Sequence, residues 1–235
     1  MTDPRRRASF AAAALLALLL ILSGCGGSSS SSNGVESKSP QEILQATKTA
    51  AKQADSVHIV GSINSGGKPI ALDMELLAGK GGKGTISQEG FTINLVQTSG
   101  AVYINGSAAF YKHVAGPAAA ALLQGKWLKA PAGSGELASL ASLTDLSTLI
   151  DTALADHGTL TKGSATTVGG QKAIALHDAS HGGALYVATT GKPYPLQITK
   201  GGSESGKVTF NRWDQPVTIT APANAIDISK LQNGG

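Results

Sequence analysis

The chain has 235 residues, of which 41% are hydrophobic and 14% charged, and its formal net charge is +4. Three of its four arginines lie at positions 5–7, and the fourth is Arg212. No cluster of Lys and Arg is interleaved with aromatic residues, so the composition argues against nucleic-acid binding. The length allows one domain of good size.

Residues 1–24 have the pattern of a secretory signal peptide. The basic residues at 5–7 precede an apolar run over 10–22. A helix of that length spans about 20 Å, too short for a hydrocarbon core of about 30 Å. The run ends in Leu22-Ser23-Gly24-Cys25, which looks like a lipobox. In proteins with this motif the thiol receives a diacylglycerol and the chain is cut just before the cysteine.

We therefore expect Cys25, the only cysteine, to become the lipidated first residue of the mature protein. Its acyl chains, palmitate among them, would hold the protein on the extracytoplasmic face of the cell membrane. The alternatives are an ordinary secretory peptide with a chance cysteine, or a short uncleaved anchor. Residues 25–38 are small and polar after the cysteine, which predicts a flexible tether. Residues 39–235 then form a single domain.

The domain opens with a helix expected over 40–54. Ser39 can cap it, Pro40 suits its first position, and Glu42 completes a capping box. From Val57 the apolar period becomes two, as in the runs around 70–76, 91–95 and 102–104. Glycine-rich turns, expected at 65–67 and 81–82, separate these runs, which predicts an antiparallel meander with one wet face.

The middle of the chain, about 107–157, has helical composition and spacing around 118–123 and 137–155, with a short extended piece at 125–128. Strands are expected again at the positions that follow: 159–167, 171–178, 183–189, 195–200, 206–213 and 216–220. A final half-turn is expected over 223–231. Strands, then helices, then strands favour the α+β class, with helices covering one face of a large antiparallel sheet.

The order of these weak motifs resembles the actinobacterial LppX/LprG-type lipoproteins, and more distantly the LolA/LolB-like lipoprotein carriers. The resemblance is carried by the lipobox, the opening Ser56-Val57-His58, the Trp segment 125–127, Pro195-Leu196-Gln197-Ile198 and the segment 210–214. It implies a strongly curved half-barrel sheet with helices across its concave face. It also implies an apolar space between the two layers that holds acyl chains of a lipid.

The other motifs in the sequence do not indicate a catalytic, dinucleotide-binding or metal-binding site. Gly79, Gly81 and Gly84 match G-x-G-x-x-G, but a strand pattern follows where dinucleotide binding requires a helix, so a hairpin loop is expected. His177, Asp178 and His181 flank a predicted turn, without the ligand cluster of a metal site. We expect no catalytic residues, no metal and no cofactor, and therefore no enzyme.

The leading hypothesis is an envelope lipoprotein that carries lipid acyl chains in an apolar cavity. The alternative is a structural or sensory lipoprotein that binds a protein partner, with its interior filled; the sequence does not identify that partner. The residues expected to line the cavity are Leu72, Met74, Ile93, Leu95, Leu122, Leu123, Leu146 and Ile150.

Overall fold

The computed structural model describes residues 31–133, 137–155 and 157–229. Residues 31–235 form one compact unit, and every described helix and strand belongs to it. The buried hydrophobic residues described also belong to it, so this unit has a core of its own. The predicted signal peptide and Cys25 lie outside the described residues.

Helix α1 (Pro40–Lys52) begins as predicted. Ser39 Oγ accepts a hydrogen bond from Glu42 N (3.4 Å), and Glu42 Oε2 accepts one from Ser39 N (2.9 Å), which completes the capping box. The helix ends two residues earlier than expected, with Gln53 as its C-terminal cap.

The predicted tether is wrong over its last residues. A short 3₁₀ helix, η1 (Val35–Ser37), precedes α1, and its Val35 is buried in the main core. Asn33 Nδ2 donates to Ala188 O (2.9 Å), and Ser32 forms a β-bridge with Thr190. One apolar side chain and these backbone partners dock this segment despite its polar composition.

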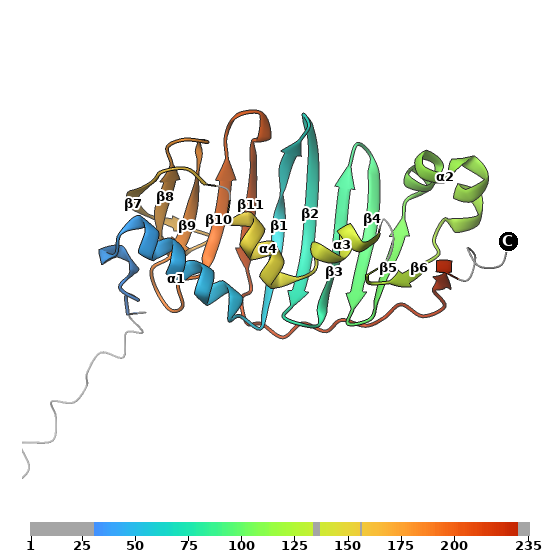
Figure 1. Cartoon of the computed structure of the whole chain (residues 1–235), viewed down its shortest axis with the longest axis horizontal. Coiled ribbons are helices and arrows are strands. Elements are labelled where there is room, and N and C mark those ends of the chain that lie inside the picture. The colour runs from blue at the N-terminus through green and yellow to red at the C-terminus, as the bar shows by residue number, and fades with distance from the viewer. Residues whose placement is uncertain (1–30, 134–136, 156, 230–235) are drawn as a thin grey trace, which may run out of the picture. The chain divides into compact units, whose positions relative to one another are not determined.

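All the described strands form one sheet, open at both ends and mostly antiparallel (Figure 1). The predicted α+β class with a single large sheet is therefore confirmed. The first meander comprises β1 (Ser56–Ser65), β2 (Lys68–Leu77), β3 (Gly81–Gln88), β4 (Phe91–Thr98), β5 (Ala101–Gly106) and β6 (Leu128–Pro131). The predicted turn at 81–82 is wrong, because these glycines already pair with β2 as the start of β3.

The second meander is β7 (Leu160–Val168), β8 (Gln171–Asp178), β9 (Gly183–Ala188), β10 (Pro195–Lys200) and β11 (Gly206–Asn211), with the 3₁₀ turn η2 (Gly202–Glu204) before its last strand. The meanders join where β11 pairs with β1. No strand forms over 216–220. Instead β12 (Ile226–Asp227) pairs in parallel with β6 at the far edge.

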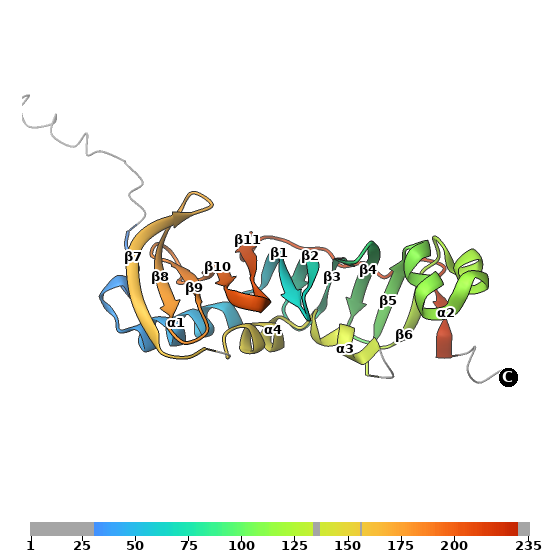
Figure 2. The same ribbon diagram turned by 90° about the horizontal axis from the view of Figure 1, so that it is seen from above.

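Three further helices interrupt the strands: α2 (Ala108–Leu123), α3 (Leu137–Ser142) and α4 (Leu146–Ala153). The segment predicted as helical over 137–155 thus forms two short helices, and Asp145 caps the second by accepting from Thr148 N (2.7 Å). Figures 1 and 2 show α1, α3 and α4 along one face of the sheet, whose two ends bend toward that side. None of the described helices is both long and apolar enough to cross a membrane.

Candidate functional site

The strand register aligns apolar side chains in rows that cross the helix-facing side of the sheet. One row, which we call the covered row, is buried throughout. Its members are Phe210, Ile59, Met74, Leu95, Ile104 and Leu128. On β3 the row passes through Gly84, which has no side chain. A Cβ on Gly84 would lie 2.6 Å from Met74 Sδ, so Met74 fills the space that this glycine leaves.

The connection between α3 and α4 packs directly on the sheet beside the covered row. Thr144 is fully buried, and its hydroxyl donates to Gln97 Oε1 (2.5 Å) on β4. A Cβ on Gly82 would lie 3.2 Å from Thr144 Cβ, so glycine permits this close approach. Leu146 and Ile150 of α4 are buried in the same core. Side chains of the protein therefore fill the space between these helices and the sheet.

The next row along the strands is different. We call it the open row: Val208, Gly61, Leu72, Ile86, Ile93 and Gly106. Its four large side chains pack on the core but stay partly exposed to solvent. Strands lie about 4.8 Å apart, so this apolar strip spans about 19 Å over the four steps from β11 to β4, with a gap at Gly61 of β1.

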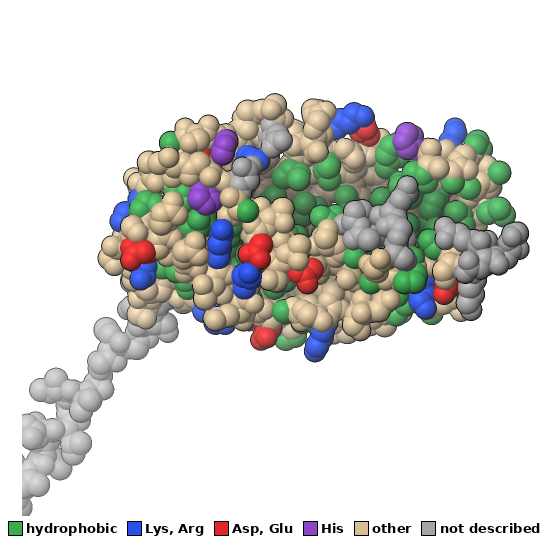
Figure 3. Space-filling view, in the orientation of Figure 1, with side chains coloured by type: hydrophobic (Ala, Val, Ile, Leu, Met, Phe, Trp, Pro, Cys, Tyr) green, Lys and Arg blue, Asp and Glu red, His purple; other side chains and the backbone are tan. Residues whose placement is uncertain are grey.

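Figure 3 shows apolar side chains gathered in a hollow on this face, over the strands of the first meander and above α3 and α4 as drawn in Figure 1. At one end, Phe110 and Leu123 of α2 also pack against the core. Phe91, at the start of β4, stacks on His113 of α2 with ring centroids 4.9 Å apart. The hollow is therefore an apolar groove bordered by α2.

The eight residues predicted to line a cavity fall into three groups. Leu72 and Ile93 lie in the open row, and Leu123 is a partly buried residue packed against the core. Met74, Leu95, Leu146 and Ile150 are instead core residues, because α3 and α4 pack closely on the sheet. Leu122 points away from the core and is 67% exposed. The prediction was thus wrong for five of the eight.

Sequence reasoning missed Ile86 and Val208, the two other large side chains of the open row. Ile86 stands alone among glycines and polar residues on β3, so its strand shows no apolar alternation. Pairing of Ile86 with Leu72 on one side and Ile93 on the other places it in the middle of the row. Counting the register back from the β3–β4 turn could have found it.

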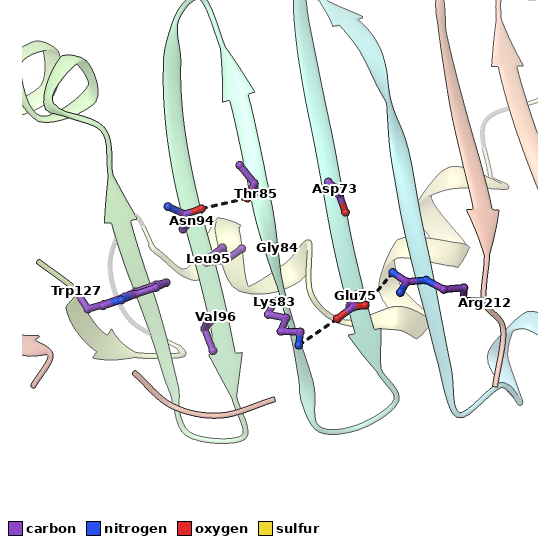
Figure 4. Close-up of a pocket in the computed structure, with 10 residues that line it drawn as sticks. All are labelled: Asp73, Glu75, Lys83, Gly84, Thr85, Asn94, Leu95, Val96, Trp127 and Arg212. Atoms are coloured by element: carbon purple, nitrogen blue, oxygen red, sulfur yellow. Dashed lines mark hydrogen bonds and ion pairs between the residues drawn. The ribbon is translucent and has the colours of Figure 1, made fainter. Parts of the chain in front are cut away.

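The opposite face of the sheet carries a depression of about 410 Å³ with both charged and apolar lining residues (Figure 4). Glu75 lines it and bridges two cations: Arg212 Nη2 is 2.8 Å from Oε1, and Lys83 Nζ is 3.1 Å from Oε2. The hydrogen bond from Lys83, with both positive charges, lowers the pKa of Glu75. The depression is lined by Asp73, Glu75, Lys83, Gly84, Thr85, Asn94, Leu95, Val96, Trp127 and Arg212. The charged side of this depression, around Glu75, does not suit an acyl chain.

The hairpin loop expected over Gly79, Gly81 and Gly84 is confirmed only at Gly79, because Gly81 and Gly84 already pair with β2 as part of β3. Asp178 accepts hydrogen bonds from the backbone of His181 (3.0 Å) and Gly158 (3.0 Å), which lower its pKa. His177, Asp178 and His181 thus surround a turn. Within the described ranges, no three His, Cys, Asp or Glu side chains lie close enough to hold a metal ion.

No family model and no curated protein matches this chain in sequence. Among solved structures, LprF from Mycobacterium bovis matches with a TM-score of 0.54 at 14% identity, over 83% of this chain and 100% of LprF. The lipoprotein LppX from Mycobacterium tuberculosis matches with a TM-score of 0.51 at 14% identity, over 77% of this chain and 98% of LppX. The domain has the fold of these two proteins.

The predicted resemblance to LppX/LprG-type lipoproteins is therefore confirmed at the level of the fold. A LolA superfamily protein from Nitrosomonas europaea matches with a TM-score of 0.28, too low to infer a shared fold from it.

Proposed function

We propose that this protein is a membrane-anchored extracytoplasmic lipoprotein that binds lipid acyl chains in the groove over the open row. The observation that carries the proposal is the incomplete cover of the helix-facing side. Leu72, Ile86 and Ile93 stay partly exposed side by side, although α3 and α4 bury the neighbouring row completely. A group of partly exposed apolar side chains on three adjacent strands is typical of an interaction site.

The dimensions of the strip suit an acyl chain. Its length of about 19 Å exceeds the depth of one bilayer leaflet, which is about 15 Å of hydrocarbon. Each methylene moved from water onto such a surface is worth about 0.8 kcal/mol, so apolar contact alone supports binding. The charged residues on the opposite face are not needed for it. The shared fold with LppX, which is itself a lipoprotein, supports the lipoprotein part of the proposal.

The direct test is native mass spectrometry of residues 26–235, purified from the native host without detergent. We expect lipid to co-purify with the wild type, and Leu72→Gln to lose it because the substitution places an amide in the apolar strip. Ala71→Gln is the matched control, since Ala71 is the exposed neighbour on the other face of β2. If the wild type carries and takes up no lipid, the alternative of a protein-partner module is favoured.

The proposed membrane anchor has a separate test. A Cys25→Ala variant has no thiol for the diacylglycerol, so it should lose both incorporated fatty acid and the processed, membrane-bound form. Membrane fractionation with metabolic fatty-acid labelling measures both. Equal label in wild type and variant would contradict the lipoprotein assignment, while leaving the groove untested.

A further inference from the structure

Helix α2 is apolar apart from Lys112 and His113, but most of it is not buried. Its sequence, AAFYKHVAGPAAAALL, would normally belong to a helix inside a protein or a membrane. Within α2, all of which is described, Tyr111 is the only buried residue. Val114 is 56% exposed and Leu122 is 67% exposed, and both are among the most exposed large hydrophobic side chains of the described residues.

The helix is fixed at its first turn, so this exposure is built into the fold. Ser107 caps the helix by accepting from Phe110 N (3.2 Å). Tyr111 Oη accepts from Gly106 N (3.0 Å), at the end of β5. Gly116 then takes φ +84° and Pro117 follows, which kinks the helix. The second half after the kink presents Ala118, Ala121 and Leu122 to solvent.

Lys112 and Lys126 are the charged residues within α2 and directly after it. Acidic residues stand at two neighbouring places: Glu89 precedes Phe91, which stacks on His113 of α2, and Asp227 of β12 pairs with Lys129. Lys112 lies on the helix and Lys126 follows it by three residues, and both are exposed. An exposed apolar surface with exposed lysines beside it is typical of elements that lie in the interface of an anionic membrane.

We propose that α2 docks onto the surface of a bilayer containing anionic phospholipids. Val114 and Leu122 enter the interfacial region, and Lys112 and Lys126 pair with lipid phosphates. This goes beyond the proposed binding of acyl chains and does not require it. Because Phe110 of α2 packs against Gly106 at the end of the open row, docking places the groove beside the membrane, where a chain can enter without crossing water.

The test is vesicle flotation with residues 26–235, the unit that carries its own core and lacks both signal peptide and Cys25. We expect binding to equimolar phosphatidylcholine–phosphatidylglycerol vesicles, and weaker binding to pure phosphatidylcholine or at high salt. Leu122→Asp should weaken it at least about tenfold. Lys112→Gln with Lys126→Gln should weaken it only on the anionic vesicles. Ile63→Asp is the control, because Ile63 is also exposed but lies at the far end of β1.

Equal flotation of Leu122→Asp and wild type would overturn the proposal, as would wild-type protein that fails to float. A wild-type dimer in light scattering that Leu122→Asp converts to monomer would also overturn it, because the occupant of α2 would then be a second copy. Leu72→Gln separates the two proposals: it should lose bound lipid and still float. Leu122→Asp should retain acyl-chain uptake from detergent solution and lose flotation.

Discussion

The two neighbouring rows on the helix-facing side of the sheet have similar apolar residues and opposite environments. In the covered row, Met74 and Leu95 are almost completely buried beneath the α3–α4 connection. Two residues further along the same strands, Leu72 and Ile93 are partly exposed. The difference does not lie in the strands, whose alternation is the same in both rows.

What separates the rows is the position of the helices. Thr144 binds Gln97 at one end of β4, and Gly82 allows that contact. Gln97 and Gly82 pair with each other next to the covered row, on the side away from the open row. The short helices α3 and α4 therefore stop short of the open row. The covered half of this face therefore contributes to the stability of the fold, and the half that the helices do not reach stays accessible to a ligand.

The largest expected effect on stability comes from truncating a side chain in the covered row. Leu95→Ala should lower the free energy of unfolding by about 2–5 kcal/mol, since it removes buried methyl groups and leaves a cavity. Ile93→Ala on the same strand and face should cost clearly less, because Ile93 is already partly exposed. Urea denaturation of both variants measures the difference. Equal losses would show that the open row is as well packed as the covered one.

A second effect concerns a cluster of hydrogen bonds around Asp214, just after β11, which we call the clamp. Asp214 accepts hydrogen bonds from Asp55 N (2.9 Å), Lys192 Nζ (2.8 Å) and Tyr194 Oη (2.5 Å). Burial acts to raise the pKa of Asp214, but the bonds from Lys192 and Tyr194 outweigh it and lower the pKa overall. Asp214→Asn should cost about 1.5–3 kcal/mol at neutral pH.

The pH dependence of this clamp has a definite sign. Because the folded-state pKa of Asp214 is lowered, the carboxylate stabilises the fold above the ordinary Asp pKa of about 3.9, and this contribution is lost as the pH falls through the folded-state value. Thermal melts from neutral pH down to about pH 3 should therefore show a steeper acid loss in wild type than in Asp214→Asn. Parallel curves would mean that the clamp does not titrate with folding.

A smaller effect should follow from removing the hydrogen bond that positions α3 and α4. Thr144→Val keeps the shape of the side chain and leaves Gln97 Oε1 without its buried donor, which should cost about 1–3 kcal/mol. Hydrogen exchange should then increase in α4 more than in β1 or β2. Uniform change across the domain would show that the contact does not set where the helices lie.

Local patterns predicted much of the fold. The capping box at Ser39 defined the start of α1, and alternation in β2 and β4 placed Leu72 and Ile93 on the helix-facing side. The sequence could not show which of the alternating residues the helices would cover. That depends on the contact of Thr144 with Gln97, 47 residues apart in the chain.

The same limit explains the remaining errors. Leu122 belongs to an apolar run, but the kink at Gly116 and Pro117 turns its part of α2 toward solvent. Val35 lies in a polar segment and is buried by residues far away in sequence. Ile86 could not be recognised from the sequence, because the glycines and polar residues of β3 show no apolar alternation. In each case a tertiary contact or a backbone kink decided burial.

The central claim, that the open row binds acyl chains, is tested most directly by placing a probe in its middle. Residues 26–235 contain no cysteine, so Ile86→Cys supplies a single thiol for an environment-sensitive fluorophore. Thr85→Cys, labelled in the same way on the opposite face, is the control. We predict that a brominated fatty acid quenches the probe at position 86 saturably and leaves the probe at position 85 unaffected. Equal quenching at both positions, or none at position 86, would contradict the account.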